Sequence, residues 1–106
     1  MKLIRDNTPN LERGTIRVCE TDGEYELALR AKIMEEAAEV GAATSQEELT
    51  KELGDLIDVI THFAIFKGIT TEAISESILD KNMRKGGFEK RLLLVYDTLE
   101  NKGGTV

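Results

Sequence analysis

Two clusters of carboxylates carry the residue types and the spacing that could do chemistry in this chain. The first is the run EEAAE at residues 35–39, and the second is the run ELGD at residues 52–55. Each cluster holds carboxylates three residues apart, a spacing that places both side chains on one face of a helix. Such a face suits a hard divalent cation with oxygen ligands, so Mg²⁺ is the natural candidate, and Mn²⁺ could substitute for it.

The position of these carboxylates within their helices is unusual for a solvated surface. Glu36 lies between Ile33 and Val40 on the predicted helical surface, and Glu52 interrupts the next apolar stripe in the same way. Unpaired charge is costly beside apolar side chains. Carboxylates that converge between two helices would repel one another, and a divalent cation would resolve that conflict. An EExxE run alone is more often a solvated surface, but the second cluster and the interrupted stripes together favour a metal site.

Two helices joined by a short link would bring the clusters face to face. Thr21 and Ser45 each precede a glutamate by three residues, which is the pattern of a capping box. The apolar periodicity then predicts helices over residues 22–42 and from Gln46 to about Lys67. Because the connection between them is short, these helices should be antiparallel neighbours. The expected apolar stripe of the second helix is Leu49, Leu53, Leu56, Ile60 and Phe63.

The rest of the chain completes the prediction of an all-α fold, an antiparallel helical bundle. A third helix is predicted from Thr70 or Thr71 to the glycine pair at residues 86–87. Short extended segments are possible near the two ends, over residues 15–20 and 92–95, and Pro9 predicts a short helix over about residues 9–13. One domain is expected over residues 1–106, with residues 100–106 as a frayed tail.

The composition narrows the classes of protein and partner. A net charge of −6 over 106 residues argues against a general binder of nucleic-acid polymers or membrane surfaces. No run of residues is apolar enough for a membrane span, and the single cysteine, Cys19, excludes an internal disulfide, so we expect a cytoplasmic location. The core of so small a chain is modest, which predicts self-association as a homodimer or homotetramer.

A basic group follows the acidic clusters. Lys81, Arg84 and Lys85 share one face of the third predicted helix. Cations near the C-terminus of a helix are favoured by its dipole, which is the plainer interpretation. The functional interpretation is a phosphate clamp, because guanidinium forks match phosphate oxygens. At the N-terminus, Lys2, Arg5 and Asp6 could extend the clamp or form surface pairs, and both alternatives stay open.

Two further polar residues continue along the second helix on the side that carries Asp55. Asp58 could bind a further metal or hydrogen-bond a metal ligand, and a half-exposed acid is an equal alternative. His62 is more often a polar residue at the edge of a core than a ligand, and an oxygen-only Mg²⁺ site does not need it.

The acidic runs also carry a family resemblance. EEAAE followed by ELGD resembles the signature of the all-α nucleoside triphosphate pyrophosphohydrolases, a superfamily that includes MazG-like enzymes, dimeric dUTPases and phosphoribosyl-ATP pyrophosphohydrolase. The opening KLIRDNTP at residues 2–9 and the closing KNMRKGGFEKR at residues 81–91 resemble a MazG-like, phosphoribosyl-ATP pyrophosphohydrolase-like branch. The resemblance covers roughly residues 2–94.

This resemblance implies a helical bundle that completes its active site by oligomerising. It implies Mg²⁺-dependent cleavage of a nucleotide substrate between the α- and β-phosphates, giving a monophosphate and pyrophosphate. Glu35 would orient or deprotonate the attacking water. The implied metal ligands are Glu36, Glu39, Glu52 and Asp55, and the implied phosphate-binding residues are Lys81 and Arg84.

Several functions fit these residues. A nucleoside triphosphate pyrophosphohydrolase that removes unwanted nucleotides is the first choice. Phosphoribosyl-ATP pyrophosphohydrolase of histidine biosynthesis is the main rival, followed by a non-catalytic helical module that binds metal or nucleotide. A plain acidic bundle without a ligand is the remaining alternative, and it predicts no change in melting temperature on adding Mg²⁺.

Overall fold

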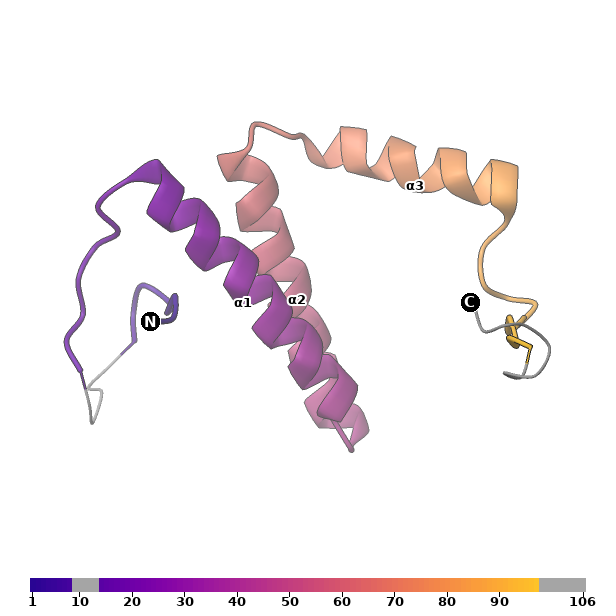
Figure 1. The fold of residues 1–106 in the computed structure, drawn as a ribbon, viewed down its shortest axis with the longest axis horizontal. Helices are drawn as coiled ribbons and strands as arrows, with labels where there is room; N and C mark the ends of the chain where they lie inside the picture. Colours follow the sequence, from indigo (N-terminus) through magenta and orange to yellow (C-terminus); the bar gives the residue numbers. More distant parts are fainter. Residues whose placement is uncertain (9–13, 98–106) are drawn as a thin grey trace. The chain divides into compact units, whose positions relative to one another are not determined.

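Three α-helices make up the regular structure of the chain. The computed structural model describes residues 1–8 and 14–97. Within these ranges lie α1 (Asp22–Ala42), α2 (Gln46–Phe66) and α3 (Thr71–Lys85), and the same ranges contain no strand (Figure 1). The all-α prediction is confirmed, and each helix begins and ends close to its predicted bounds. The short helix predicted at residues 9–13 and the tail at residues 100–106 lie outside the described residues.

The chain divides into two compact units, residues 1–74 and 75–106. Both carboxylate clusters belong to the first unit, and most of α3 belongs to the second. The single-domain organisation stays a prediction. None of the helices in the described ranges is both long and apolar enough to cross a membrane.

Side-chain caps explain where the helices begin. The Thr21 and Ser45 hydroxyls each accept a hydrogen bond of 3.0 Å from the backbone N–H three residues on, so both predicted caps are confirmed. Thr70 caps α3 in the same way, accepting from Ala73 at 3.0 Å. These contacts satisfy N–H groups that have no partner within the first turn of a helix. Gly68 ends α2 with a φ of 72°, a left-handed conformation that favours glycine.

α1 and α2 pack against each other antiparallel, as the short link predicts (Figure 1). Contacts far from the link show the register. The Tyr25 ring near the start of α1 meets the Phe66 ring at the end of α2 edge to face, with centroids 5.0 Å apart. Beside it, Lys67 Nζ lies 3.0 Å from the carboxylate of Glu26. Leu29, only 1% exposed, is the most buried side chain of this pair.

The buried face of α2 differs in part from the predicted stripe. Val59 is buried, whereas Leu53 and Ile60 are exposed. On α1, Ala37 is exposed while the neighbouring Glu36 is buried. Within this unit α1 covers one side of α2 only, so apolar side chains on the other side stay at the surface. The periodicity predicted the helices correctly but did not give the rotation of each helix about its axis.

The two predicted extended segments form no strand. Residues 15–19 and 91–97 have no regular structure. A strand needs a neighbouring strand to pair its backbone N–H and C=O groups, and within the described ranges neither segment has one. The first segment is held to α1 by a guanidinium–carboxylate pair instead, in which Arg17 Nη1 donates to Glu24 Oε1 at 2.9 Å.

Candidate metal centre

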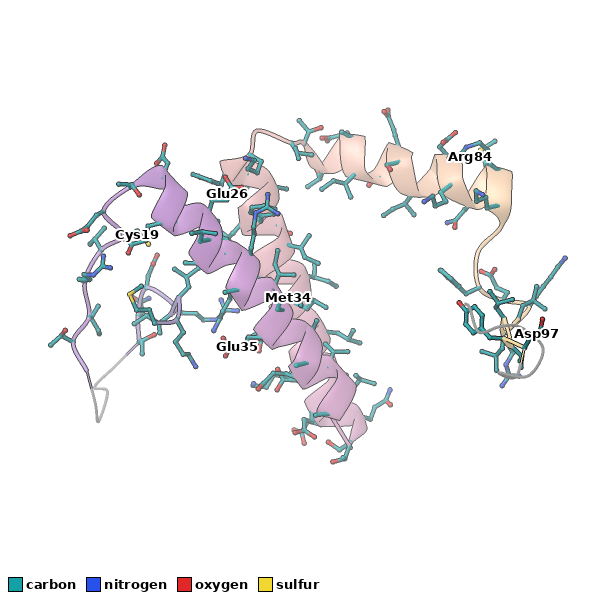
Figure 2. The ribbon with its side chains drawn as sticks, in the orientation of Figure 1. Cys19, Glu26, Met34, Glu35, Arg84 and Asp97 are labelled. Carbon is teal, nitrogen blue, oxygen red and sulfur yellow. The ribbon has the colours of Figure 1, made fainter. Side chains whose placement is uncertain are left out.

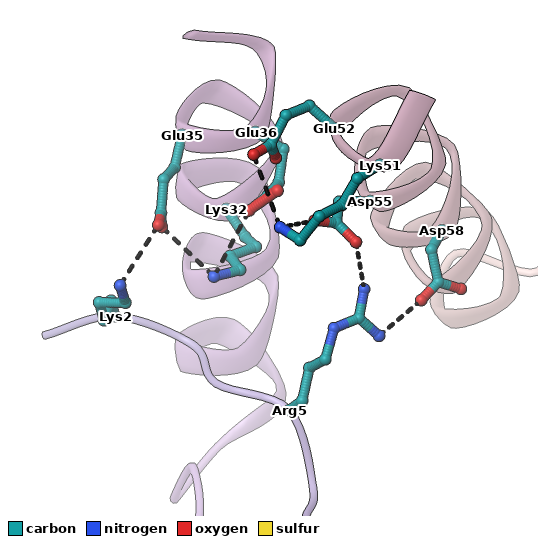
Figure 3. Close-up of polar contacts among 9 residues, drawn as sticks. All are labelled: Lys2, Arg5, Lys32, Glu35, Glu36, Lys51, Glu52, Asp55 and Asp58. Atoms are coloured by element: carbon teal, nitrogen blue, oxygen red, sulfur yellow. Dashed lines mark hydrogen bonds and ion pairs between the residues drawn. The ribbon is translucent and has the colours of Figure 1, made fainter. Parts of the chain in front are cut away.

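Three carboxylates from the two predicted clusters converge between α1 and α2. Glu36 comes from α1, and Glu52 and Asp55 come from α2 (Figure 3). One oxygen from each lies within 4.8 Å of the other two. Glu36 and Glu52 are only 8% and 7% exposed, and Asp55 is half-buried. Antiparallel packing produces this convergence, because it places the middle of α1 opposite the first half of α2.

The carboxylate of Glu52 is only partly satisfied by its surroundings. Its Oε1 atom is buried and has no hydrogen-bond partner among the described residues. Its other oxygen lies 3.6 Å from Lys51 Nζ, beyond hydrogen-bond length. A buried carboxylate oxygen without a partner costs free energy, and a coordinated cation removes that cost. The donor set consists of hard oxygens, so the residues present fit Mg²⁺ or Mn²⁺.

Cations of the chain itself surround the three carboxylates. Lys32, which is largely buried, lies 3.7 Å from Glu36, and Lys51 lies 3.6 Å from Asp55. Arg5 Nη2 donates to Asp55 Oδ1 at 3.2 Å. The sequence suggested a set of unpaired like charges, but in the structure cations of the chain pair with these carboxylates. Both lysine pairs have the four-residue spacing of helical ion pairs, which is the signal in the sequence that could have revealed them.

Glu35 lies beside this group but outside it. Two lysines contact its carboxylate, Lys2 at 3.3 Å and Lys32 at 3.4 Å. Burial acts to raise the pKa of Glu35, but the hydrogen bond from Lys2 and the charge of Lys32 outweigh it and lower that pKa below its usual value. Glu35 is therefore ionised at neutral pH. Lys2 and Arg5 form ion pairs with carboxylates of α1 and α2, and an extension of the phosphate clamp by these residues stays a prediction.

The structure does not bring every predicted site residue into the group. Glu39 is exposed and is not one of the three converging carboxylates. Asp58 accepts a hydrogen bond of 2.8 Å from Arg5, which is the main cause of its lowered pKa. His62 is exposed, and its Nε2 lies 3.5 Å from Asp58. Asp58 and His62 are both outside the group of three.

The predicted phosphate-binding residues lie on α3. Lys81 and Arg84 are both exposed, and Figure 2 shows Arg84 on this helix. Arg84 Nε donates to Asp80 at 2.9 Å within the same helix. Because they belong to the second compact unit, their approach to the carboxylates stays a prediction.

A shallow hollow opens beside the carboxylates at the start of α2. Its walls are formed by Ser45, Glu47, Glu48, Lys51 and Glu52. Three of these side chains are acidic, so an anionic ligand would need a cation between itself and this wall.

One family of known proteins matches this chain over most of its length. The family model described as phosphoribosyl-ATP pyrophosphohydrolase matches residues 1–82. No curated protein and no solved structure matches the chain. The matched span takes in the N-terminal segment with Arg5, both carboxylate clusters and Lys81, and it ends before Arg84. The resemblance seen in the acidic runs is thereby confirmed for the family.

Proposed function

Because the chain belongs to the phosphoribosyl-ATP pyrophosphohydrolase family, within the all-α nucleoside triphosphate pyrophosphohydrolase superfamily, we propose that it hydrolyses phosphoribosyl-ATP and releases pyrophosphate. The observation that carries this proposal is the convergence of Glu36, Glu52 and Asp55 inside the matched span. It supports a metal-dependent reaction on a polyphosphate. The first expectation, a nucleoside triphosphate substrate, moves to second place because the family is described by phosphoribosyl-ATP.

The converging carboxylates are proposed to hold Mg²⁺, with Glu39 as a further ligand. Support comes from the buried, unpartnered oxygen of Glu52, which a cation would satisfy. Bound Mg²⁺ would neutralise charge on the phosphate oxygens and polarise water. The carboxylates hold their positions because two rigid helices carry them and burial restricts their rotamers.

Glu35 is proposed to orient or deprotonate the attacking water. Its carboxylate is ionised at neutral pH and can accept a hydrogen bond from water, whereas its lowered pKa makes it a weaker base, which favours orientation of the water over its deprotonation. Hydrogen bonds from Lys2 and Lys32 hold the Glu35 carboxylate next to Glu36. Glu35 is not one of the three converging carboxylates, so it is available to contact a water. Phosphoryl transfer depends on such positioning and on charge neutralisation more than on covalent help from the protein.

Lys81 and Arg84 are proposed to bind substrate phosphates. Arg84 presents a planar fork of donors, and Lys81 presents a point charge on the same helix. Hydrolysis of the substrate between its α- and β-phosphates would give a nucleoside monophosphate derivative and pyrophosphate. A loss of either cation should raise KM more than it lowers kcat, because both charges contact the substrate in its ground state as well.

A pyrophosphate-release assay tests the proposed function. The substrates are phosphoribosyl-ATP and a panel of ribo- and deoxyribonucleoside triphosphates, each with and without Mg²⁺. We expect Mg²⁺-dependent release from phosphoribosyl-ATP, reduced by roughly two orders of magnitude or more in Glu36→Gln. The matched control is Glu76→Gln, which changes an exposed glutamate of α3.

Each other outcome of this assay selects a different function. Release of pyrophosphate from one nucleoside triphosphate alone would favour a nucleoside triphosphate pyrophosphohydrolase that removes unwanted nucleotides. A silent panel, with a melting temperature that still rises on adding Mg²⁺, would favour a binding module. If no substrate releases pyrophosphate and Mg²⁺ does not change the melting temperature, the remaining interpretation is a plain acidic bundle without a ligand.

A further inference from the structure

Arg5 reaches from the N-terminal segment to two carboxylates of α2. Its Nη1 donates to Asp58 Oδ2 at 2.8 Å, and its Nη2 donates to Asp55 Oδ1 at 3.2 Å (Figure 3). Only Asp55 belongs to the three converging carboxylates. One guanidinium therefore spans a carboxylate of the candidate metal centre and a carboxylate outside it.

The two bonds of Arg5 can be separated. The contact with Asp58 is the shorter, and it does not involve the converging carboxylates. The other oxygen of Asp55 lies 3.6 Å from Lys51, so both oxygens of Asp55 face cations of the chain. A divalent cation bound to Asp55 competes with both partners for the negative charge of this carboxylate. Arg5 can release Asp55 and remain anchored by Asp58, because its planar fork makes the two contacts through different nitrogens.

The charge of the surrounding network indicates what Arg5 would contact next. Ion pairs link five carboxylates and four cations around this site, so the network carries a net charge of about −1 without metal. Its members are Lys2, Arg5, Lys32, Lys51, Glu35, Glu36, Glu52, Asp55 and Asp58. Counted over these nine residues, one divalent cation makes the charge about +1, and a cation that takes Asp55 Oδ1 in place of Arg5 leaves the Nη2 donors without that acceptor. Phosphate oxygens supply both the missing acceptor and the missing negative charge.

We propose that Arg5 alternates between two anionic partners. Without metal it is the counter-ion of Asp55, and with metal it keeps Asp58 and binds a phosphate oxygen of the substrate. The inference rests on the proposed function, since it needs a divalent cation at Asp55. It adds to the substrate site a phosphate-binding residue from the N-terminal segment, on the same compact unit as the carboxylates.

Arg5→Gln separates the counter-ion role from the phosphate-binding role, because it should lower the Kd for Mn²⁺ and raise the KM for the substrate. Mn²⁺ titration followed by electron paramagnetic resonance should give a Kd about three- to tenfold lower, since an exposed competing charge is removed. The KM for phosphoribosyl-ATP should rise about tenfold or more, with a smaller change in kcat. Arg5→Lys keeps the charge without the fork and should give an intermediate KM.

Arg17→Gln is the matched control, because it removes an arginine of the same N-terminal region whose carboxylate partner, Glu24, lies outside the network. It should leave the Mn²⁺ Kd and the KM unchanged. A second probe needs no turnover: pyrophosphate with Mg²⁺ should raise the melting temperature of the unaltered chain more than that of Arg5→Gln.

The outcomes distinguish this inference from the proposed function. Turnover by the unaltered chain together with an unchanged or higher Mn²⁺ Kd in Arg5→Gln would overturn the counter-ion role alone. A lower Kd with unchanged KM and unchanged pyrophosphate stabilisation would overturn the phosphate-binding role. An unaltered chain that binds neither Mn²⁺ nor pyrophosphate would overturn the proposed function and this inference with it.

Discussion

The carboxylates of Glu36 on α1 and Glu52 on α2 face each other between the helices, and their oxygens come within 4.8 Å. Both residues are more than nine-tenths buried, at 8% and 7% exposed. Lys32 and Lys51 offset their repulsion in part, each at more than 3.5 Å. The metal-free fold therefore carries an electrostatic cost in the contact between α1 and α2.

Removing the charge of Glu52 should stabilise the metal-free protein. We expect Glu52→Gln to raise its free energy of unfolding by about 1 kcal/mol, because the buried oxygen without a partner is no longer charged. The same change should abolish the rise in melting temperature on adding Mg²⁺. Thermal denaturation with and without Mg²⁺ measures both effects, with Glu76→Gln as the control. A less stable metal-free variant that still responds to Mg²⁺ would contradict the site.

Glu36 and Glu39 should differ in their effect on metal affinity. Glu36 is buried among the converging carboxylates, whereas Glu39 is exposed and outside that group. We expect Glu36→Gln to weaken Mn²⁺ binding by about 100-fold or more and Glu39→Gln by about 10-fold or less. Mn²⁺ titration of the two variants compares them directly. Equal losses would show that Glu39 contributes as much to metal affinity as Glu36, which its exposed position does not predict.

The core of the helix pair should depend on Leu29. This side chain is 1% exposed, whereas Leu27 on the same helix is 70% exposed. We expect Leu29→Ala to lower the free energy of unfolding by about 2–4 kcal/mol, through lost burial and a residual cavity, and Leu27→Ala by less than about 1 kcal/mol. Urea denaturation gives both values. Similar losses at the two positions would show that Leu27 is covered in solution.

Acid should weaken the attachment of the N-terminal region to α1. The hydrogen bond from Arg17, together with the Glu20 N–H, lowers the pKa of Glu24 from 4.5 to about 2. Because the folded state holds this proton more weakly than the unfolded chain, the contribution of Glu24 to stability is complete above pH 4.5 and is lost as the pH falls towards 2. The difference in melting temperature between the unaltered chain and Glu24→Gln should therefore shrink across that window. A difference that stays constant from pH 6 to about pH 2 would contradict the assignment.

Self-association should cover apolar side chains that α1 and α2 leave at the surface. Met34 on α1 is exposed (Figure 2), as are Ile57 and Ile65 on α2. We expect sedimentation to show a homodimer or homotetramer, and Ile57→Lys to shift it towards a smaller species. A monomer of the unaltered chain at assay concentration would refute this prediction.

Local interactions explain what could be predicted from sequence. The caps at Thr21 and Ser45 involve residues three positions apart, so the sequence alone determined where α1 and α2 begin. The short link between the helices forces an antiparallel pair, and that pair brings Glu36 opposite Glu52. The candidate centre thus follows from periodicity and one connection, without any long-range information.

Contacts between distant residues were decided only by the tertiary structure. The sequence could not indicate that Lys2 and Arg5 meet carboxylates of α1 and α2, because an irregular segment has no periodicity that reports its path. Nor could it show that Glu39 stays exposed, since the rotation of a helix about its axis depends on how the partner packs. Residues 15–20 failed as a strand for a related reason: a strand exists only where another segment pairs with it. Helix bounds, the opposed acids and their pairs with Lys32 and Lys51 follow from local sequence, whereas the contacts of Lys2 and Arg5 with those acids are set by the path of the chain in space.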